Sequence, residues 1–151
     1  MRKIFVSVLT VLFLGILFNC TSATKQNTAI NTPEYHIQRQ WMLVSFENFT
    51  KADLMKNKAE INLTGKQEEG KIRGGAYMGC NSMSFSAEFK NNGNVKILAL
   101  LSTMKACQNM ELENEFQKKF EHMTKYKVEG HFLTLSDDKG NSMKFVASDW
   151  D

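Results

Sequence analysis

An alternating segment followed by a tight turn is the feature that most constrains how this chain can fold. Within residues 82–89, every second position is apolar, at Met83, Phe85, Ala87 and Phe89. The turn that follows, residues 91–94, contains Asn-Gly, a pair that accepts the positive φ angles of a type I′ turn. Residues 95–98 then supply an apolar partner strand. The pattern predicts an antiparallel hairpin near the middle of the chain.

Short strands separated by turn residues are predicted along most of the remaining chain. They cover residues 41–46, 59–64, 71–77, 126–129, 131–135 and 143–146. Several alternate with period two, as Ile61 and Leu63 do, and this alternation is typical of half-buried strands. Gly74 and Gly75 indicate a bend or bulge within the strand over 71–77.

One amphipathic helix is predicted over residues 109–124. Its apolar stripe recurs at spacings of four, four and three residues, at Leu112, Phe116, Phe120 and Met123. Acidic residues gather at its start and basic residues at its end, an order that complements the helix dipole. About seven strands and one helix predict a mainly β, α+β domain. The expected architecture is a small antiparallel β-barrel or strongly curved sheet with the helix packed on it.

An apolar leader begins the chain. Arg2 and Lys3 precede an apolar run over residues 4–18, and the sequence turns polar directly after Cys20. This order is typical of a secretory signal peptide, and the run is shorter than the roughly 20 residues that cross a bilayer. The predicted organisation is a signal peptide over 1–19, a flexible tether over 20–39 and one folded domain over 40–151.

The cysteine at the end of the leader resembles the lipobox of bacterial lipoproteins. This resemblance implies that Cys20 becomes the lipidated first residue of the exported protein, anchored to the cell envelope, with the outer membrane as the expected location. Acylating Cys20 would also leave an even pair among the three cysteines. A plain secreted chain with a free Cys20 and an uncleaved membrane anchor are the alternatives.

The charge balance argues against nucleic acid as a partner. The chain has 19 basic and 16 acidic residues, and the leader holds two of the basic ones, so 17 and 16 remain after cleavage. No block of five or six like charges occurs in the sequence, although such blocks are common in nucleic-acid-binding chains.

Cys80 and Cys107 are the first candidates for chemistry. In an exported protein the leading interpretation is a structural disulfide that closes a loop of about 27 residues. A redox-active pair is an alternative, although the sequence lacks the Cys-x-x-Cys spacing that lowers a thiol pKa. Two free buried thiols are the other alternative.

Other motifs give little support for catalysis or for a bound cofactor. His36, His122 and His131 lack the spacing of zinc ligands. Ser102-Thr103 has no Gly-x-Ser-x-Gly elbow and no identifiable histidine partner. We therefore expect no enzyme activity, no catalytic or metal-binding residue and no cofactor.

A set of aromatic residues leaves two interpretations open. Its members are Trp41, Phe46, Phe85, Phe89, Phe116 and Phe120. They form either the packed core or the lining of an apolar cavity, because small barrels either fill their interior with side chains or hold one ligand.

The order of these elements and motifs resembles the META domain family, which includes the heat-shock-linked HslJ lipoproteins. The matching residues lie between 40 and 146. They are Trp41 and Leu43, Gly79-Cys80-Asn81, Ser102-Thr103-Met104-Lys105-Ala106-Cys107, Glu115-Phe116 and Leu133-Thr134-Leu135. The resemblance implies a small barrel or curved sheet with one helix.

The expected function is that of a non-enzymatic envelope lipoprotein, a structural or interaction module linked to envelope or stress physiology. Its expected partners are the membrane, through Cys20, and an envelope protein or apolar ligand of unknown identity, and we expect a monomer. The alternative is a carrier or sensor that binds an apolar small molecule or lipid inside the barrel.

Overall fold

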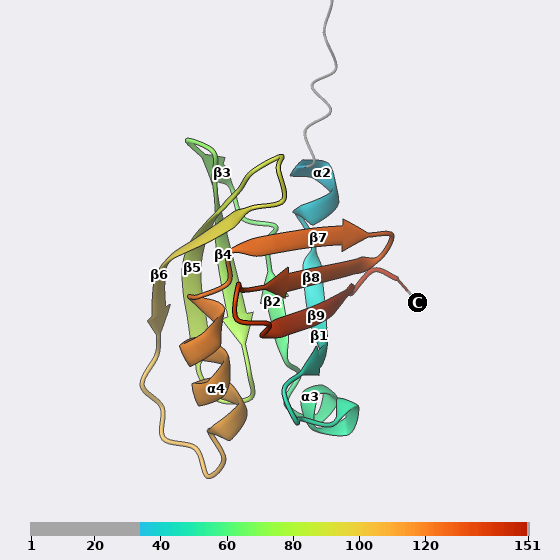
Figure 1. Ribbon diagram of the computed structural model, residues 1–151. Helices are drawn as coiled ribbons and strands as arrows, with labels where there is room; N and C mark the ends of the chain where they lie inside the picture. The colour runs from blue at the N-terminus through green and yellow to red at the C-terminus, as the bar shows by residue number, and fades with distance from the viewer. Residues whose placement is uncertain (1–33, 151) are drawn as a thin grey trace, which may run out of the picture. The chain divides into compact units, whose positions relative to one another are not determined.

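The computed structural model describes residues 34–150, which fold around one antiparallel sheet (Figure 1). Its strands are β1 (Gln40–Phe46), β2 (Glu60–Asn62), β3 (Gln67–Glu68), β4 (Lys71–Tyr77), β5 (Ser82–Phe89), β6 (Val95–Ser102), β7 (Lys125–Glu129), β8 (Phe132–Ser136) and β9 (Ser142–Ala147). The helices are α2 (Glu34–Ile37), α3 (Lys51–Lys56) and α4 (Glu111–Phe120). The predicted signal peptide, Cys20 and the first part of the predicted tether lie outside the described residues.

The sheet is a strongly curled half-barrel. Its strand order is β6-β5-β4-β2-β1-β9-β8-β7, with β3 paired to β4 beside this path. The predicted hairpin is confirmed, since β5 and β6 pair antiparallel from Met83↔Ser102 to Phe89↔Val95. The expected class, a mainly β domain with a curved antiparallel sheet and a packed amphipathic helix, is therefore correct.

The first and last strands of the path, β6 and β7, approach each other only at one end. There the Val95 N–H donates to the Thr124 carbonyl at 2.9 Å, and the Tyr126 N–H donates to the Gly93 carbonyl at 2.8 Å. A single bridge between Asn94 and Lys125 accompanies these bonds. We call the junction of β6 and β7 the seam, and only this end of it is joined by backbone.

Helix α4 packs on the curled sheet through its predicted apolar stripe. Phe116 and Phe120 stack on each other with ring centroids 4.6 Å apart. Phe120 meets Phe85 of β5 edge to face at 4.9 Å, and Phe116 meets Phe46 of β1 at 6.5 Å. The helix thus connects strands from both halves of the sheet through aromatic side chains.

The folded part begins earlier than the predicted boundary at residue 40. Ile37 of α2 is buried in the core, and the indole N–H of Trp41 donates to the Ile37 carbonyl at 2.9 Å. Residues 34–39, which the sequence pattern assigned to the tether, therefore include a helical turn that packs on β1. This turn is not predicted from the sequence, because Ile37 is the residue that buries it and the surrounding composition is polar.

Of the bend or bulge predicted at Gly74-Gly75, the bulge is contradicted by the structure. β4 pairs with β5 in continuous register through both glycines. Gly74 is needed instead because the ring of Phe85 lies where a β-carbon would stand. The irregularity lies one strand further along, where the β5–β6 register shifts between Ser84 and Ser86 and Ala99 has a φ of 51°.

Candidate functional site

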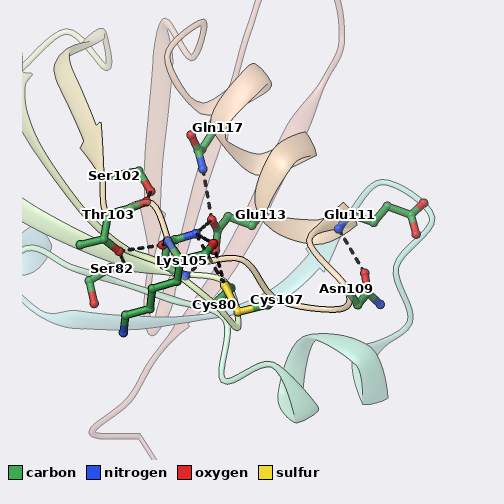
Figure 2. Close-up of a disulfide and its surroundings, with 11 residues drawn as sticks. Cys80, Ser82, Ser102, Thr103, Lys105, Cys107, Asn109, Glu111, Glu113 and Gln117 are labelled. Carbon is green, nitrogen blue, oxygen red and sulfur yellow. Dashed lines mark hydrogen bonds between the residues drawn. A yellow bond between two sulfur atoms is a disulfide. The ribbon is translucent and has the colours of Figure 1, made fainter.

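Two of the motifs that resemble the META family, residues 79–81 and 102–107, meet around a disulfide (Figure 2). Cys80, between β4 and β5, bonds to Cys107 in the connection from β6 to α4, with the two Cα atoms 6.1 Å apart. Cys80 is buried and Cys107 is exposed. The bond joins the end of the sheet to the segment that leads into the helix, as the structural interpretation of this pair predicts.

Asn81, beside the disulfide, is a buried amide with a complete set of partners. It is 1% exposed. Its Nδ2 donates to Glu113 Oε1 at 2.7 Å and to the Lys105 carbonyl at 3.2 Å. Its Oδ1 accepts from the Lys105 N–H at 2.7 Å and from Thr103 Oγ1 at 2.8 Å. The side chain thereby holds the connection between β6 and α4 in one conformation.

Glu113 of α4 completes this group, which we call the motif cluster: Asn81, Thr103, Lys105 and Glu113. Glu113 is also 1% exposed, and its Oε2 accepts the backbone N–H of Asn81 at 2.7 Å. Gln117, one turn later, donates to Oε1 at 3.4 Å. From the sequence, Glu113 is predicted only to complement the helix dipole as one of the acidic residues of the first turn. Its buried role is not predicted.

The motif cluster joins backbone segments through side-chain hydrogen bonds. Within residues 34–150, no buried side-chain nitrogen or oxygen lacks a hydrogen-bond partner. Thr103, half of the Ser-Thr pair considered as a nucleophile, accepts the Ser82 N–H at 3.2 Å and donates to Asn81. A hydroxyl engaged on both sides and a fully bonded amide position backbone segments, as satisfied buried networks do.

The other motif positions have different environments. Gly79 has a φ of +110°, a conformation that side-chain-bearing residues rarely adopt, and a β-carbon there would collide with Asn57. Trp41 lies in the core, at the second position of β1. Ala106 is exposed in the β6–α4 connection. Trp41, Gly79, Asn81, Thr103 and Ala106 are thus not one site, because only Asn81 and Thr103 are joined among the described side-chain hydrogen bonds.

The aromatic set forms packed core. Trp41 is 0% exposed, and Phe46, Phe85, Phe116 and Phe120 are buried with it in one continuous cluster. Phe89 is partly buried and packs against this cluster. These rings fill the inner side of the half-barrel where a ligand cavity would have to lie.

Histidine and acidic side chains do not converge on a metal site within the described part of the chain. His36 and His131 line one surface cleft, whereas His122 is exposed just after α4. No helix within residues 34–150 has the length and apolar character needed to cross a membrane.

An apolar groove lies where α3 packs beside β1, β2 and β9, and we call it the α3 groove. It has a volume of about 420 Å³. Its apolar part comes from Met42, Leu43, Val44, Leu54, Met55, Ala59 and Val146. Lys51, Lys58 and Glu60 are its charged members. Met55 is 67% exposed, so this surface presents apolar atoms to solvent.

Helix α3, which forms one wall of this groove, was not predicted from the sequence. A capping box starts it: the Asp53 N–H donates to Thr50 Oγ1 at 3.2 Å, and the Thr50 N–H donates to Asp53 Oδ2 at 3.1 Å. The hydrogen bond from the Thr50 side chain also lowers the pKa of Asp53 from its ordinary value. Thr50 and Asp53, three residues apart, are the sequence signal that could have revealed this helix.

The half-barrel with one stapled helix defines the class of domain, and comparison of the sequence gives the family. The META domain model matches residues 34–150. The chain belongs to the META domain family. No curated protein is significantly similar to it in sequence.

Solved structures share this fold at low sequence identity. An NMR structure of a protein from Burkholderia xenovorans matches with a TM-score of 0.60 and 18% identity over 74% of this chain and 83% of that one. A second NMR structure matches with a TM-score of 0.59 and 22% identity, over 78% and 96%. A DUF4847 family protein from Bacteroides vulgatus gives a TM-score of 0.50 and 14% identity, over 78% and 98%. At these identities the likeness concerns the fold alone.

Proposed function

We propose that this protein is a non-enzymatic interaction module of the bacterial envelope, anchored by a lipid on Cys20 and active through its α3 groove. The groove binds an apolar segment of another envelope protein that carries carboxylates beside the apolar residues. The link to heat shock or envelope stress is part of the proposal, and its support is the resemblance to the HslJ lipoproteins.

The observation that carries this proposal is the contrast between a filled interior and an apolar exterior groove. The rings of Trp41 and Phe85 are buried among other core side chains. By contrast, Met42 and Met55 are both exposed and both line the α3 groove. Methionine adapts to irregular partners and is common on surfaces that bind several of them. A partner on the outside therefore fits this domain better than a ligand within it.

Charge at the rim of the groove favours an acidic partner segment. Lys51 and Lys58 line the groove, and Lys58 stands just beyond the end of α3. Glu60, the one acidic residue in the lining, already accepts a hydrogen bond from Gln40 Nε2 at 2.6 Å. Two lysines and one glutamate give the lining a net positive charge, which complements carboxylates on the partner.

The anchor and the export route rest on the leader and on the disulfide. An apolar run that ends at Cys20 supports lipidation, and the Cys80–Cys107 bond fits an oxidising compartment. Replacing Cys20 with Ala should release the exported protein from membranes, measured by fractionation of cells into membrane and soluble parts. Unchanged retention of the variant in the membrane fraction would contradict the lipid anchor.

Photocrosslinking of the anchored protein in living bacteria tests the groove. p-Benzoylphenylalanine placed at position 55 should yield an adduct whose partner peptide, identified by mass spectrometry, is apolar and flanked by Asp or Glu. Charge reversal by Lys51→Glu with Lys58→Glu should reduce that adduct about tenfold or more, since each close charge pair at an interface can contribute 1.5 kcal/mol or more.

Position 104 provides the matched control, because Met104 is 99% exposed but lies outside the α3 groove. The same photoreactive residue there should give no such adduct. Equal adducts from both positions would contradict the proposal. So would a crosslink between two copies of the chain, or a crosslink to a lipid alone, which would favour the carrier alternative.

A further inference from the structure

A second surface hollow, here called the α2 cleft, lies between α2, β7 and the turn that joins β5 to β6. Its volume is about 630 Å³. Side chains that line it include His36, Arg39, Asn91, Tyr126, Lys127 and His131. The α2 cleft shares no lining residue with the α3 groove, and helices α2 and α3 lie at opposite ends of β1 (Figure 1). Its chemistry therefore goes beyond the function proposed for the groove.

The lining of the α2 cleft is basic and contains no carboxylate. Arg39 and Lys127 carry positive charge, two imidazoles accompany them, and no Asp or Glu is among the lining residues. Each cation has an acidic partner outside the lining: Arg39 with Asp149 at 3.8 Å and Lys127 with Glu129 at 2.7 Å. Both acidic side chains are mostly exposed. Exposed pairs of this kind contribute little free energy, so the cations can turn to a ligand at low cost.

The walls of the α2 cleft are held by the closed end of the seam. Tyr126 donates its backbone N–H to the Gly93 carbonyl at 2.8 Å and its phenolic O–H to the Lys90 carbonyl at 3.0 Å. These bonds tie β7 to the β5–β6 turn, and Asn91 lies within the same turn. The walls of the α2 cleft are therefore formed before a ligand binds. A preformed site reduces the entropy that is lost when a ligand binds.

The α2 cleft includes residues that follow the predicted membrane anchor closely in the sequence. In the sequence, 13 residues separate Cys20 from Glu34, the first residue of α2. The segment over residues 20–33 contains Lys25 and no acidic residue. It therefore lacks the negative charge that the α2 cleft would complement, and an external anion fits better.

We infer that the α2 cleft binds a phosphate group. Arg39 presents a planar guanidinium suited to paired hydrogen bonds with phosphate oxygens. Lys127 adds a point charge, while the imidazoles and the Asn91 amide can donate further hydrogen bonds. The phosphate could be that of a lipid headgroup at the anchoring membrane or that of a soluble phosphoester. The two sources share this chemistry and can be separated by experiment.

Binding by the full-length chain carrying Cys20→Ala tests this inference. One arm measures flotation with vesicles of phosphatidylcholine alone and with vesicles that contain phosphatidylglycerol. The other arm measures calorimetric binding of inorganic phosphate and of glycerol 1-phosphate. The double variant Arg39→Gln with Lys127→Gln should weaken the observed phosphate binding about tenfold or more, since each basic residue near an anionic surface strengthens binding to that surface.

The control removes the same two charges at another surface. Lys66 and Arg73 both contact Glu68, at 3.4 Å and 3.1 Å, and both are highly exposed. Lys66→Gln with Arg73→Gln should therefore leave the affinity for phosphate within about twofold of the wild-type value, because ion pairs between exposed side chains contribute little free energy.

Three results support the α2 cleft and name the source of the phosphate. Cleft-dependent binding to anionic vesicles alone identifies a lipid headgroup, binding to the small phosphates alone identifies a soluble phosphoester, and binding to both identifies the phosphate group itself. The inference is overturned if neither arm shows binding, or if the cleft variant and its control lose binding equally.

Discussion

The two ends of the seam between β6 and β7 are closed in different ways. At the β5–β6 turn, backbone hydrogen bonds join Val95 to Thr124 and Tyr126 to Gly93. At the other end, α4, the motif cluster and the disulfide take the place of backbone pairing. Backbone bonds survive most substitutions, whereas a closure made of side chains depends on particular residues. Single substitutions should therefore damage the helix end far more than the turn end.

The largest expected effect is the loss of an aromatic ring at the helix end. Phe120→Ala should lower the free energy of unfolding by about 4 kcal/mol, because the ring is fully buried between Phe85 and Phe116. Urea denaturation monitored by circular dichroism measures the change. Phe89→Ala is the matched control, since Phe89 is half-buried against Tyr126 at the turn end. A loss at Phe89 equal to that at Phe120 would contradict the comparison.

Breaking the disulfide should have the next largest effect. Cys107→Ser should cost about 3.5 kcal/mol under oxidising conditions, as expected in the chain-entropy model when the cross-link between residues 27 apart is lost. Reductant should lower the unfolding midpoint of the wild-type protein to about that of the variant. It should leave the midpoint of the variant unchanged. A wild-type midpoint that does not respond to reductant would show that the bond does not stabilise the domain in solution.

The motif cluster offers a sharper probe of the helix end. Asn81→Ala should lower the free energy of unfolding by about 3 kcal/mol, because it leaves Glu113 Oε1 with only the longer bond from Gln117 and the Lys105 backbone N–H without its acceptor. Asn81→Asp keeps the size of the side chain but turns a donor into an acceptor that faces the Glu113 carboxylate. Thermal unfolding at neutral pH should show a loss for the aspartate variant at least as large. An aspartate variant as stable as the wild type would contradict the hydrogen-bond assignment.

The smallest expected effect lies at the turn end. Tyr126→Phe should cost about 0.5–1 kcal/mol, because it removes the hydrogen bond to the Lys90 carbonyl but leaves the backbone bonds. Burial raises the pKa of Tyr126, so the folded state holds the phenolic proton more tightly than the unfolded state does. This contribution is complete below the ordinary pKa of about 10 and is lost as the pH rises through the raised value.

Denaturation at two pH values separates that contribution from others. The stability advantage of the wild type over Tyr126→Phe should shrink between pH of about 9 and about 11. A constant difference across this range would show that Tyr126 titrates alike in the folded and unfolded states.

Local patterns in the sequence predicted an element well where nothing within that element interrupted the pattern. The strand predicted over residues 71–77 coincides with β4, because its alternation and flanking turns agree. The strand predicted over 95–98 is observed as β6, which continues to Ser102. Its second half was missed because Ala99 adopts a φ of 51° and interrupts the alternation of period two.

The candidate sites were harder to predict for a different reason. The predicted export of the chain indicated that Cys80 and Cys107 could pair, but Glu113 resembled any acidic residue in the first turn of a helix. Its burial depends on Asn81, which lies 32 residues earlier in the chain. Both surface hollows likewise gather residues from separate elements, and α3 forms one wall of the groove although its sequence carries only a short capping signal.

The sequence alone determined the antiparallel class, the central hairpin, the apolar face of α4, the resemblance to the META family and the expectation of an anchored, exported chain. These properties depend on neighbouring residues, whose periodicity decides which face is apolar and where the chain turns. The tertiary structure decided how the seam closes, what Asn81 and Glu113 bind, and where Arg39 and Lys127 meet. Those contacts join residues far apart in the chain, and local periodicity does not specify which distant partner a buried face or a polar group will find.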